Sequence, residues 1–223
     1  MLTVQRKGRN LHLMLESGII AVIRAQSSDQ LVDVALALRE GGVKAIEVTM
    51  TTPNALKVIS DVSARLQDEE AVIGVGTVLD PETARAALLA GAEYVVSPTL
   101  NPAVIEMCRR YSAIVIPGAF SPTEILTAWE AGADIVKVFP ATGLGPRYFK
   151  DVLGPLPQVR LSPTGGVSLE TVGDFIKAGA CAVAVGGNLV TKKALAGKDW
   201  KSITETAKEF IKRIRDAREE KKG

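Results

Sequence analysis

The stretch Ala131-Gly132-Ala133-Asp134-Ile135-Val136-Lys137-Val138-Phe139 ends one regular element and begins another. Glycine is the usual residue just after a helix, and the β-branched run that follows is typical of a buried strand. Similar junctions occur at Ala90-Gly91-Ala92-Glu93 and Ala178-Gly179-Ala180-Cys181, with a looser copy at Gly41-Gly42-Val43-Lys44. The repeat therefore marks the passage from helix to strand in a chain built of βα units.

Short apolar runs recur along the chain and predict parallel strands covered on both faces. They are Ile19–Arg24, Ala45–Thr49, Ala71–Gly76, Tyr94–Ser97, Ala113–Pro117, Asp134–Phe139, Val159–Ser162 and Cys181–Gly186. Amphipathic helical patterns fill the gaps, among them Gln30–Glu40, Asn54–Leu66, Glu82–Ala90 and Thr123–Ala131. Three helices are expected to begin at a capping residue followed by proline, at Asp80-Pro81, Asn101-Pro102 and Ser121-Pro122.

This alternation predicts one α/β domain over residues 1–223, a (β/α)8 TIM barrel with an N-terminal helix and a C-terminal helix. The C-terminal helix, Trp200–Arg218, carries an apolar stripe expected to pack on the barrel or on a neighbouring subunit. An open doubly wound sheet is the alternative. It is disfavoured because no GxGxxG motif follows the first strand, and Gly74-Val75-Gly76 lacks the remaining glycine.

Composition excludes several classes of function. The net charge of the 223 residues is +2, which gives no reason to expect a nucleic-acid partner. The apolar run near the N-terminus is too short to cross a membrane, and no signal peptide is predicted. Cys108 and Cys181 form no redox or metal motif and are expected to be buried, as in a cytoplasmic protein. His12, the one histidine, is expected to be structural or exposed, and we expect neither a metal nor a cofactor.

Two ionisable residues lie inside apolar strand runs. Lys137 shares a face with Ile135 and Phe139, and points either into the barrel or toward the helices. A desolvated lysine has a pKa lowered from about 10.4, which makes the amine a nucleophile. Glu47 could pair with this amine and move protons beside it. The alternative interpretations are a lysine extending along the strand end to reach solvent and a structural ion pair.

Glycine pairs follow the last two predicted strands. Gly165-Gly166 comes after the seventh and Gly186-Gly187 after the eighth, where barrels of this kind often bind a phosphate group. Plain turn glycines are the alternative. Other polar groups follow strand ends: Arg24, whose guanidinium could clamp a carboxylate, Thr77, and Ser97-Pro98.

At these residues the chain resembles the 2-keto-3-deoxy-6-phosphogluconate (KDPG) / 4-hydroxy-2-oxoglutarate aldolase family. The matching segments cover nearly the whole predicted barrel in the family's order. They are residues 41–49 (GGVKAIEVT), 74–79 (GVGTVL), 96–98 (VSP), 116–118 (IPG), 137–141 (KVFPA), 163–167 (PTGGV) and 185–190 (VGGNLV).

The resemblance implies a class I aldolase, a lyase that cleaves a keto-acid sugar phosphate to pyruvate and needs no metal. Lys137 would form the Schiff base and Glu47 would be the general acid/base. It further implies a homotrimer. The remaining site residues would be Arg24, Thr77, Pro98, Phe139 and Thr164 for the substrate, and Gly165, Gly166, Gly186, Gly187 and Asn188 for the phosphate.

Two departures from the family pattern bear on substrate choice. Many members carry an arginine where this chain has Thr51, for which Arg24 offers a substitute, and some carry a serine in place of Asn188. The preferred substrate therefore stays open among KDPG, its galactonate epimer and 4-hydroxy-2-oxoglutarate. Two different functions on the same fold also stay open: a phosphate-binding isomerase that forms no imine, and a non-catalytic trimeric scaffold.

Overall fold

The computed structural model describes residues 2–23, 28–66 and 71–221. The strands of these ranges are short and lie close to the predicted apolar runs: β1 (Ile19–Ile23), β2 (Ala45–Thr49), β3 (Val72–Gly76), β4 (Tyr94–Val96), β5 (Ile114–Ile116), β6 (Gly118–Ala119), β7 (Val136–Val138), β8 (Leu161–Pro163) and β9 (Val183–Val185). The helices are α1 (Val4–Ser17), α2 (Ser28–Glu40), α3 (Ala55–Arg65), α4 (Pro81–Leu89), α5 (Pro102–Arg110), α6 (Pro122–Glu130), α7 (Gly145–Leu153), α8 (Val172–Lys177), α9 (Lys192–Gly197) and α10 (Trp200–Glu220).

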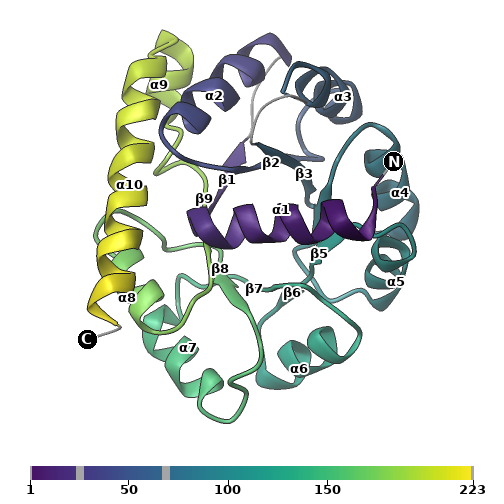
Figure 1. The fold of residues 1–223 in the computed structure, drawn as a ribbon, viewed down its shortest axis with the longest axis vertical. Helices are drawn as coiled ribbons and strands as arrows, with labels where there is room; N and C mark the ends of the chain where they lie inside the picture. Colours follow the sequence, from purple (N-terminus) through teal and green to yellow (C-terminus); the bar gives the residue numbers. More distant parts are fainter. Residues whose placement is uncertain (1, 24–27, 67–70, 222–223) are drawn as a thin grey trace.

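The parallel strands close into a barrel surrounded by helices (Figure 1). Hydrogen bonding runs in the order β5-β4-β3-β2-β1-β9 and in the order β6-β7-β8. β5 and β6 are one barrel strand interrupted at Pro117, whose carbonyl accepts from the Lys137 N–H at 2.9 Å. A bridge between Thr164 and Ala184 joins β8 to β9. The predicted (β/α)8 barrel is therefore confirmed, and the open sheet is excluded because its two edges meet.

The expected helix boundaries are present. Asp80, Asn101 and Ser121 each accept a backbone N–H with their side chains at the starts of α4, α5 and α6, and each is followed by proline. The glycines of the junction motif, Gly91, Gly132 and Gly179, have φ values of 110°, 100° and 107°. Side chains with a Cβ rarely adopt this region, which explains why glycine recurs at these helix ends.

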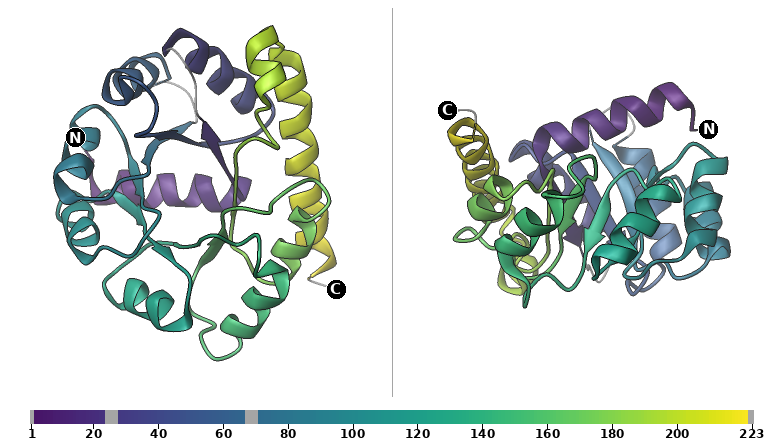
Figure 2. Two further views of the ribbon diagram at one scale, coloured as in Figure 1. Left: turned by 180° about the vertical axis from the view of Figure 1, so that it is seen from behind. Right: turned by 90° about the horizontal axis from the view of Figure 1, so that it is seen from below.

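Helix α1 lies across one end of the barrel and leaves the other end uncovered by it (Figures 1 and 2). Its Met14 is fully buried in the cluster of side chains inside the barrel, together with Ile20 and Ile114. Because Gly18 leads directly from α1 into β1, the covered end is the one where the strands begin. The carboxyl ends of the strands, where barrels of this kind carry their active sites, lie at the other end.

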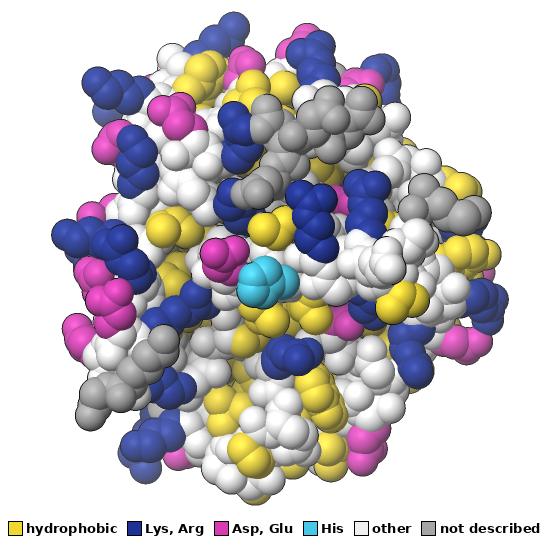
Figure 3. Space-filling model, viewed as in Figure 1, with side chains coloured by type: hydrophobic (Ala, Val, Ile, Leu, Met, Phe, Trp, Pro, Cys, Tyr) yellow, Lys and Arg dark blue, Asp and Glu magenta, His cyan; other side chains and the backbone are white. Residues whose placement is uncertain are grey.

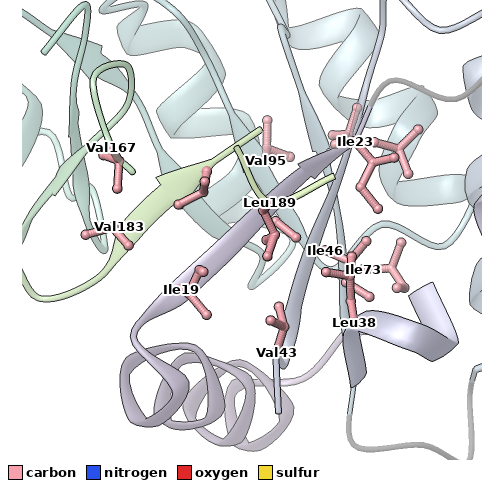
Figure 4. Packing of buried hydrophobic residues seen from close by; sticks show 14 of the residues in the cluster. Ile19, Ile23, Leu38, Val43, Ile46, Ile73, Val95, Val167, Val183 and Leu189 are labelled. Atoms are coloured by element: carbon pink, nitrogen blue, oxygen red, sulfur yellow. The ribbon is translucent and has the colours of Figure 1, made fainter. Parts of the chain in front are cut away.

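The core has two parts. One fills the barrel and contains Ile20, Ala45, Tyr94 and Ile135. The larger part lies between the strands and the helices, where alternate strand residues such as Ile46 pack outward (Figure 4). Each strand is thus buried on both faces, as its continuous apolar run predicts. This alternation sorts the strand residues into those facing the barrel interior and those facing the helices.

The C-terminal helix α10 packs on the barrel's own helices α2 and α8. Its apolar residues Ile203, Ala207, Phe210 and Ile214 are buried, and Ile211 is half-buried. Of the two alternatives for this stripe, packing on the barrel is therefore the one observed. Among the described residues, no helix combines the length and the apolar character needed to cross a membrane.

Candidate active site

Lys137 and Glu47 face the interior of the barrel. Ile135, just before β7, belongs to the interior cluster, while Val136 and Val138 on β7 pack against the helices, so Lys137 points inward. The same alternation on β2 turns Glu47 inward. The two side chains are 8% and 3% exposed, respectively. Of the two orientations open for Lys137, the one toward the barrel interior is thus observed.

The strand order places these two residues on opposite walls. Four pairings along the barrel, from β2 through β3, β4 and β5/β6 to β7, separate Glu47 from Lys137. The interior of an eight-stranded barrel is only wide enough to be filled by side chains. The long side chains of an acid and an amine therefore share one buried space near the carboxyl ends of the strands.

Two glycines on β3 make room for large side chains of the neighbouring strands. A Cβ added to Gly76 would lie 1.8 Å from Glu47 Oε1, and one added to Gly74 would lie 2.3 Å from the Tyr94 ring. The Glu47 carboxylate therefore lies against the backbone of Gly76. Burial, and next the negative charge of Glu47, raise the pKa of Tyr94 well above its usual value, so this phenol stays protonated.

The surroundings of Lys137 are an aromatic ring, a glycine and a hydroxyl group. Its Nζ lies 4.7 Å from the centroid of the Phe139 ring, a distance at which a protonated amine is attracted to the ring face. Its neighbours in register are Gly118 on β6 and Ser162 on β8. A Cβ on Gly118 would meet the Pro98 carbonyl at 2.3 Å, so Pro98 packs tightly against the strand beside Lys137.

Thr77 and Thr164 follow the carboxyl ends of β3 and β8. Thr77 has φ 61°, in the left-handed region that residues with a Cβ seldom adopt. Such backbone strain clusters at ligand and catalytic sites. The Thr164 hydroxyl is buried and has no hydrogen-bond partner among the described residues, which leaves it available to a ligand.

The two glycine loops lie side by side. Asn188 Nδ2, in the loop after β9, donates to the Val167 carbonyl in the loop after β8 at 2.7 Å. Gly165 and Gly166 have φ values of 94° and 73° and pack against Thr142, with built Cβ positions 2.9 and 3.0 Å from its atoms. Gly187 is exposed, and a Cβ on it would touch nothing within 4 Å. The structure thus brings the predicted phosphate loops together at the carboxyl end of the barrel.

The remaining predictions have mixed outcomes. Arg24 lies outside the described residues. Thr51, the departure from the family pattern noted in the sequence, shares a hydrogen bond with Thr49 at 2.9 Å between their Oγ1 atoms. His12 is exposed on the outer side of α1 (Figure 3). Cys108 is buried as expected, whereas Cys181 is only half-buried, and both are free.

Sequence reasoning missed Tyr94 and Ser162. Both stand in apolar strand runs, are buried, and carry a hydroxyl without a hydrogen-bond partner in the described part of the chain. A polar residue at an inward position of a strand was the available signal. No group of three or more potential metal-ligating side chains occurs in the described ranges.

A buried amine opposite a buried carboxylate, beside neighbouring glycine loops, can form an imine with a keto acid and move protons around it. Comparisons with known proteins agree with this chemistry. A family model for KDPG and KHG aldolase matches residues 12–206. The chain is 34% identical to a 2-dehydro-3-deoxy-phosphogluconate aldolase of Pseudomonas aeruginosa over 218 residues, which cover 96% of this chain and 97% of that protein.

Two further relatives widen the range of substrates and intermediates. The chain is 32% identical to a 2-dehydro-3-deoxy-6-phosphogalactonate aldolase of Escherichia coli, over 89% of this chain and 95% of that protein. A crystal structure of the KDPG aldolase from Legionella pneumophila, with pyruvate captured as a covalent carbinolamine, has a TM-score of 0.82 and 28% identity. That match covers 89% of this chain and 96% of the other.

Proposed function

The chain belongs to the KDPG and KHG aldolase family, and we propose that it cleaves KDPG to pyruvate and glyceraldehyde 3-phosphate through an imine on Lys137. It is a carbon–carbon lyase. The observation that carries the proposal is the burial of Lys137 and Glu47 at inward positions of opposite barrel walls. A nucleophilic amine and a proton-transferring carboxylate are the two groups that imine chemistry requires.

The mechanism begins when the Lys137 amine attacks the C2 ketone of the substrate. Glu47 transfers protons as the carbinolamine forms and loses water. The protonated imine then accepts the electron pair of the C3–C4 bond as that bond breaks. Glu47 takes the proton of the C4 hydroxyl group, and glyceraldehyde 3-phosphate leaves. A proton returns to C3 of the enamine, and hydrolysis of the imine releases pyruvate and the free amine.

Side chains around the two central residues would hold the substrate. Thr77, Pro98 and Thr164 are proposed to line the pyruvyl group, with the Phe139 ring beside the imine. Gly165, Gly166, Gly186, Gly187 and Asn188 are proposed to bind the phosphate through backbone N–H groups and a side-chain amide. Arg24 is proposed to contact the substrate carboxylate. The left-handed backbone of Thr77 and the unpartnered Thr164 hydroxyl support these assignments.

Turnover on three substrates tests the substrate assignment. We expect KDPG to give the highest kcat/KM, with the galactonate epimer and 4-hydroxy-2-oxoglutarate as the alternatives that the family includes. Pyruvate release is measured with lactate dehydrogenase and NADH. A higher kcat/KM for the galactonate epimer would transfer the proposal to that substrate, an outcome to which the E. coli relative gives weight. Full activity in a Glu47→Gln variant would remove Glu47 from its role.

We also propose that residues 1–223 act as one domain, that three copies assemble into a trimer, and that the protein works in the cytoplasm. Membership of the KDPG and KHG aldolase family supports the trimer. Two free cysteines support a reducing compartment. Sedimentation equilibrium tests the trimer, and a monomer that retains full activity would contradict it.

A further inference from the structure

Tyr94 lies inside the barrel, on the α1 side of Glu47, the proposed acid/base residue. Its side chain is fully buried in the interior cluster with Val72, Val96 and Ile114. The ring crosses β3, because a Cβ on Gly74 would lie 2.3 Å from both Cε1 and Cζ of the ring. Since Cζ carries the hydroxyl group, the polar end of the ring lies over β3 and is directed from β4 toward β2.

Glu47 lies on the far side of β3 from Tyr94. It is paired in register with Gly74, the residue that the Tyr94 ring covers. Its carboxylate reaches toward Gly76, two residues further along β3, where it contacts the backbone. The phenol therefore lies nearer to α1, and the carboxylate lies nearer to the carboxyl ends of the strands. Burial is the main cause of the raised pKa of Tyr94, and the negative charge of Glu47 raises it further.

The Tyr94 hydroxyl has an unmet need for a hydrogen-bond partner. It is buried and bonds to no residue in the described ranges, and its neighbours in the cluster are apolar. A buried hydroxyl left without a partner is destabilising, because it has lost its hydrogen bonds to water. Such groups are regularly satisfied by a buried water with two or more polar neighbours. The hydroxyl is directed toward β2, two strands away from β4, and the polar group on that strand is the Glu47 carboxylate.

We propose that Tyr94 is a positioning residue for Glu47, its hydroxyl donating to the carboxylate through one bridging water. This water-mediated hydrogen bond holds the Glu47 carboxylate, from the α1 side, in the orientation that faces the imine. It also stabilises the ionised form of Glu47, because a hydrogen bond to a carboxylate favours the charged state. Tyr94 would thereby keep Glu47 ready to accept the C4 hydroxyl proton. This inference rests on the proposed function, in which Glu47 is the general acid/base.

The Tyr94→Phe variant removes the hydroxyl and keeps the ring that fills the space over Gly74. We expect kcat for KDPG cleavage to fall about tenfold with KM within about twofold, because the loss affects proton transfer more than binding. The acid limb of the kcat–pH profile should move to higher pH, since Glu47 loses a donor that stabilises its ionised form. Deuterium exchange of the pyruvate methyl group, which uses the same carboxylate, should slow by a similar factor.

Tyr148→Phe is the matched control. This change also deletes a phenolic hydroxyl, one that donates to the Phe120 carbonyl at 2.6 Å, and the Tyr148 ring packs against the outer core rather than the interior cluster. We expect its pH profile and exchange rate to match those of the wild type. Thermal unfolding of both variants tells a loss of fold from a loss of positioning, and the midpoint of Tyr94→Phe should stay within a few degrees of the wild type.

Reduction with borohydride in the presence of pyruvate, run on the wild type in parallel, separates the two proposals. If the wild type forms no adduct, the imine mechanism fails and the role of Tyr94 falls with it. If both wild type and Tyr94→Phe form the adduct but their kcat and acid limbs coincide, only the Tyr94 proposal is overturned. A Tyr94→Phe variant with lower kcat, a lower unfolding midpoint and an unshifted acid limb would show a structural role and overturn it as well.

Discussion

Adding one methyl group at Gly76 should displace the Glu47 carboxylate, the proposed acid/base, and leave its chemical identity unchanged. A Cβ at this position would lie 1.8 Å from Glu47 Oε1, 2.5 Å from Cδ and 2.8 Å from Cγ. Ordinary contact begins near 3.4 Å, so in Gly76→Ala the carboxylate oxygen has to move by about 1.6 Å. The φ of Gly76 is not in the left-handed region, so the alanine backbone itself is unstrained.

The magnitude follows from the sensitivity of catalysis to geometry. A displacement of about 1 Å at a catalytic group can cost about 10²-fold in rate. We therefore expect kcat/KM for KDPG to fall by roughly two orders of magnitude in Gly76→Ala, with destabilisation of about 1–3 kcal/mol from the added volume. The coupled pyruvate assay gives the rate, and urea unfolding gives the stability.

Gly8→Ala is the control for glycine replacement. Gly8 lies in α1, and a Cβ there would meet nothing within 4 Å. We expect unchanged kcat/KM and a slightly more stable protein, because alanine is the better helix residue. A folded Gly76→Ala protein with wild-type kcat/KM would refute the reasoning, since Glu47 could then be moved without consequence for the reaction.

Four further outcomes are expected. Lys137→Met should lose cleavage activity but remain folded by circular dichroism, because an apolar chain of similar length replaces a buried amine; wild-type turnover would contradict this. Asn188→Ala should raise KM for KDPG and leave KM for 4-hydroxy-2-oxoglutarate unchanged, because only KDPG carries the phosphate; equal rises would remove Asn188 from the phosphate site. Arg218→Ala should lower the free energy of unfolding by about 2 kcal/mol, because its guanidinium donates to the Leu15, Glu16 and Cys181 carbonyls. The control Arg215→Ala should change the free energy of unfolding by less than about 0.5 kcal/mol. Burial raises the pKa of Cys108 to about 12, so only about 1 in 10⁴ of its thiol groups is ionised at pH 8. Iodoacetamide should therefore alkylate Cys108 only after urea unfolds the protein.

The fold was largely predictable because its signals are local. Continuous apolar runs, capping residues before proline and glycines at helix ends each depend on a few neighbouring residues. The resemblance to the aldolase family, drawn from motifs along the whole chain, is confirmed by the family model. The fifth strand continues beyond Pro117 as Gly118–Ala119, which the apolar pattern did not indicate because proline normally ends a strand.

The site was predictable only in part, because its geometry depends on register across the barrel. The face of Lys137 stayed open until the interior cluster around Ile135 was known. The contact between Gly76 and Glu47 arises from the pairing of β2 with β3 and from the direction of the Glu47 side chain, which extends along β3 from Gly74 toward Gly76. Tyr94 reads in the sequence as an ordinary core aromatic, and its hydroxyl gains importance only from its place below Glu47.

The central claim is that Lys137 forms an imine with the keto acid. The most direct test is to incubate the protein with pyruvate, reduce it with borohydride and locate the adduct by peptide mass spectrometry. We predict one reduced pyruvyl adduct, on the peptide that contains Lys137, and none in Lys137→Met. A folded wild-type protein without an adduct, or with the adduct on another lysine, would contradict the account and favour an isomerase or a scaffold on the same barrel.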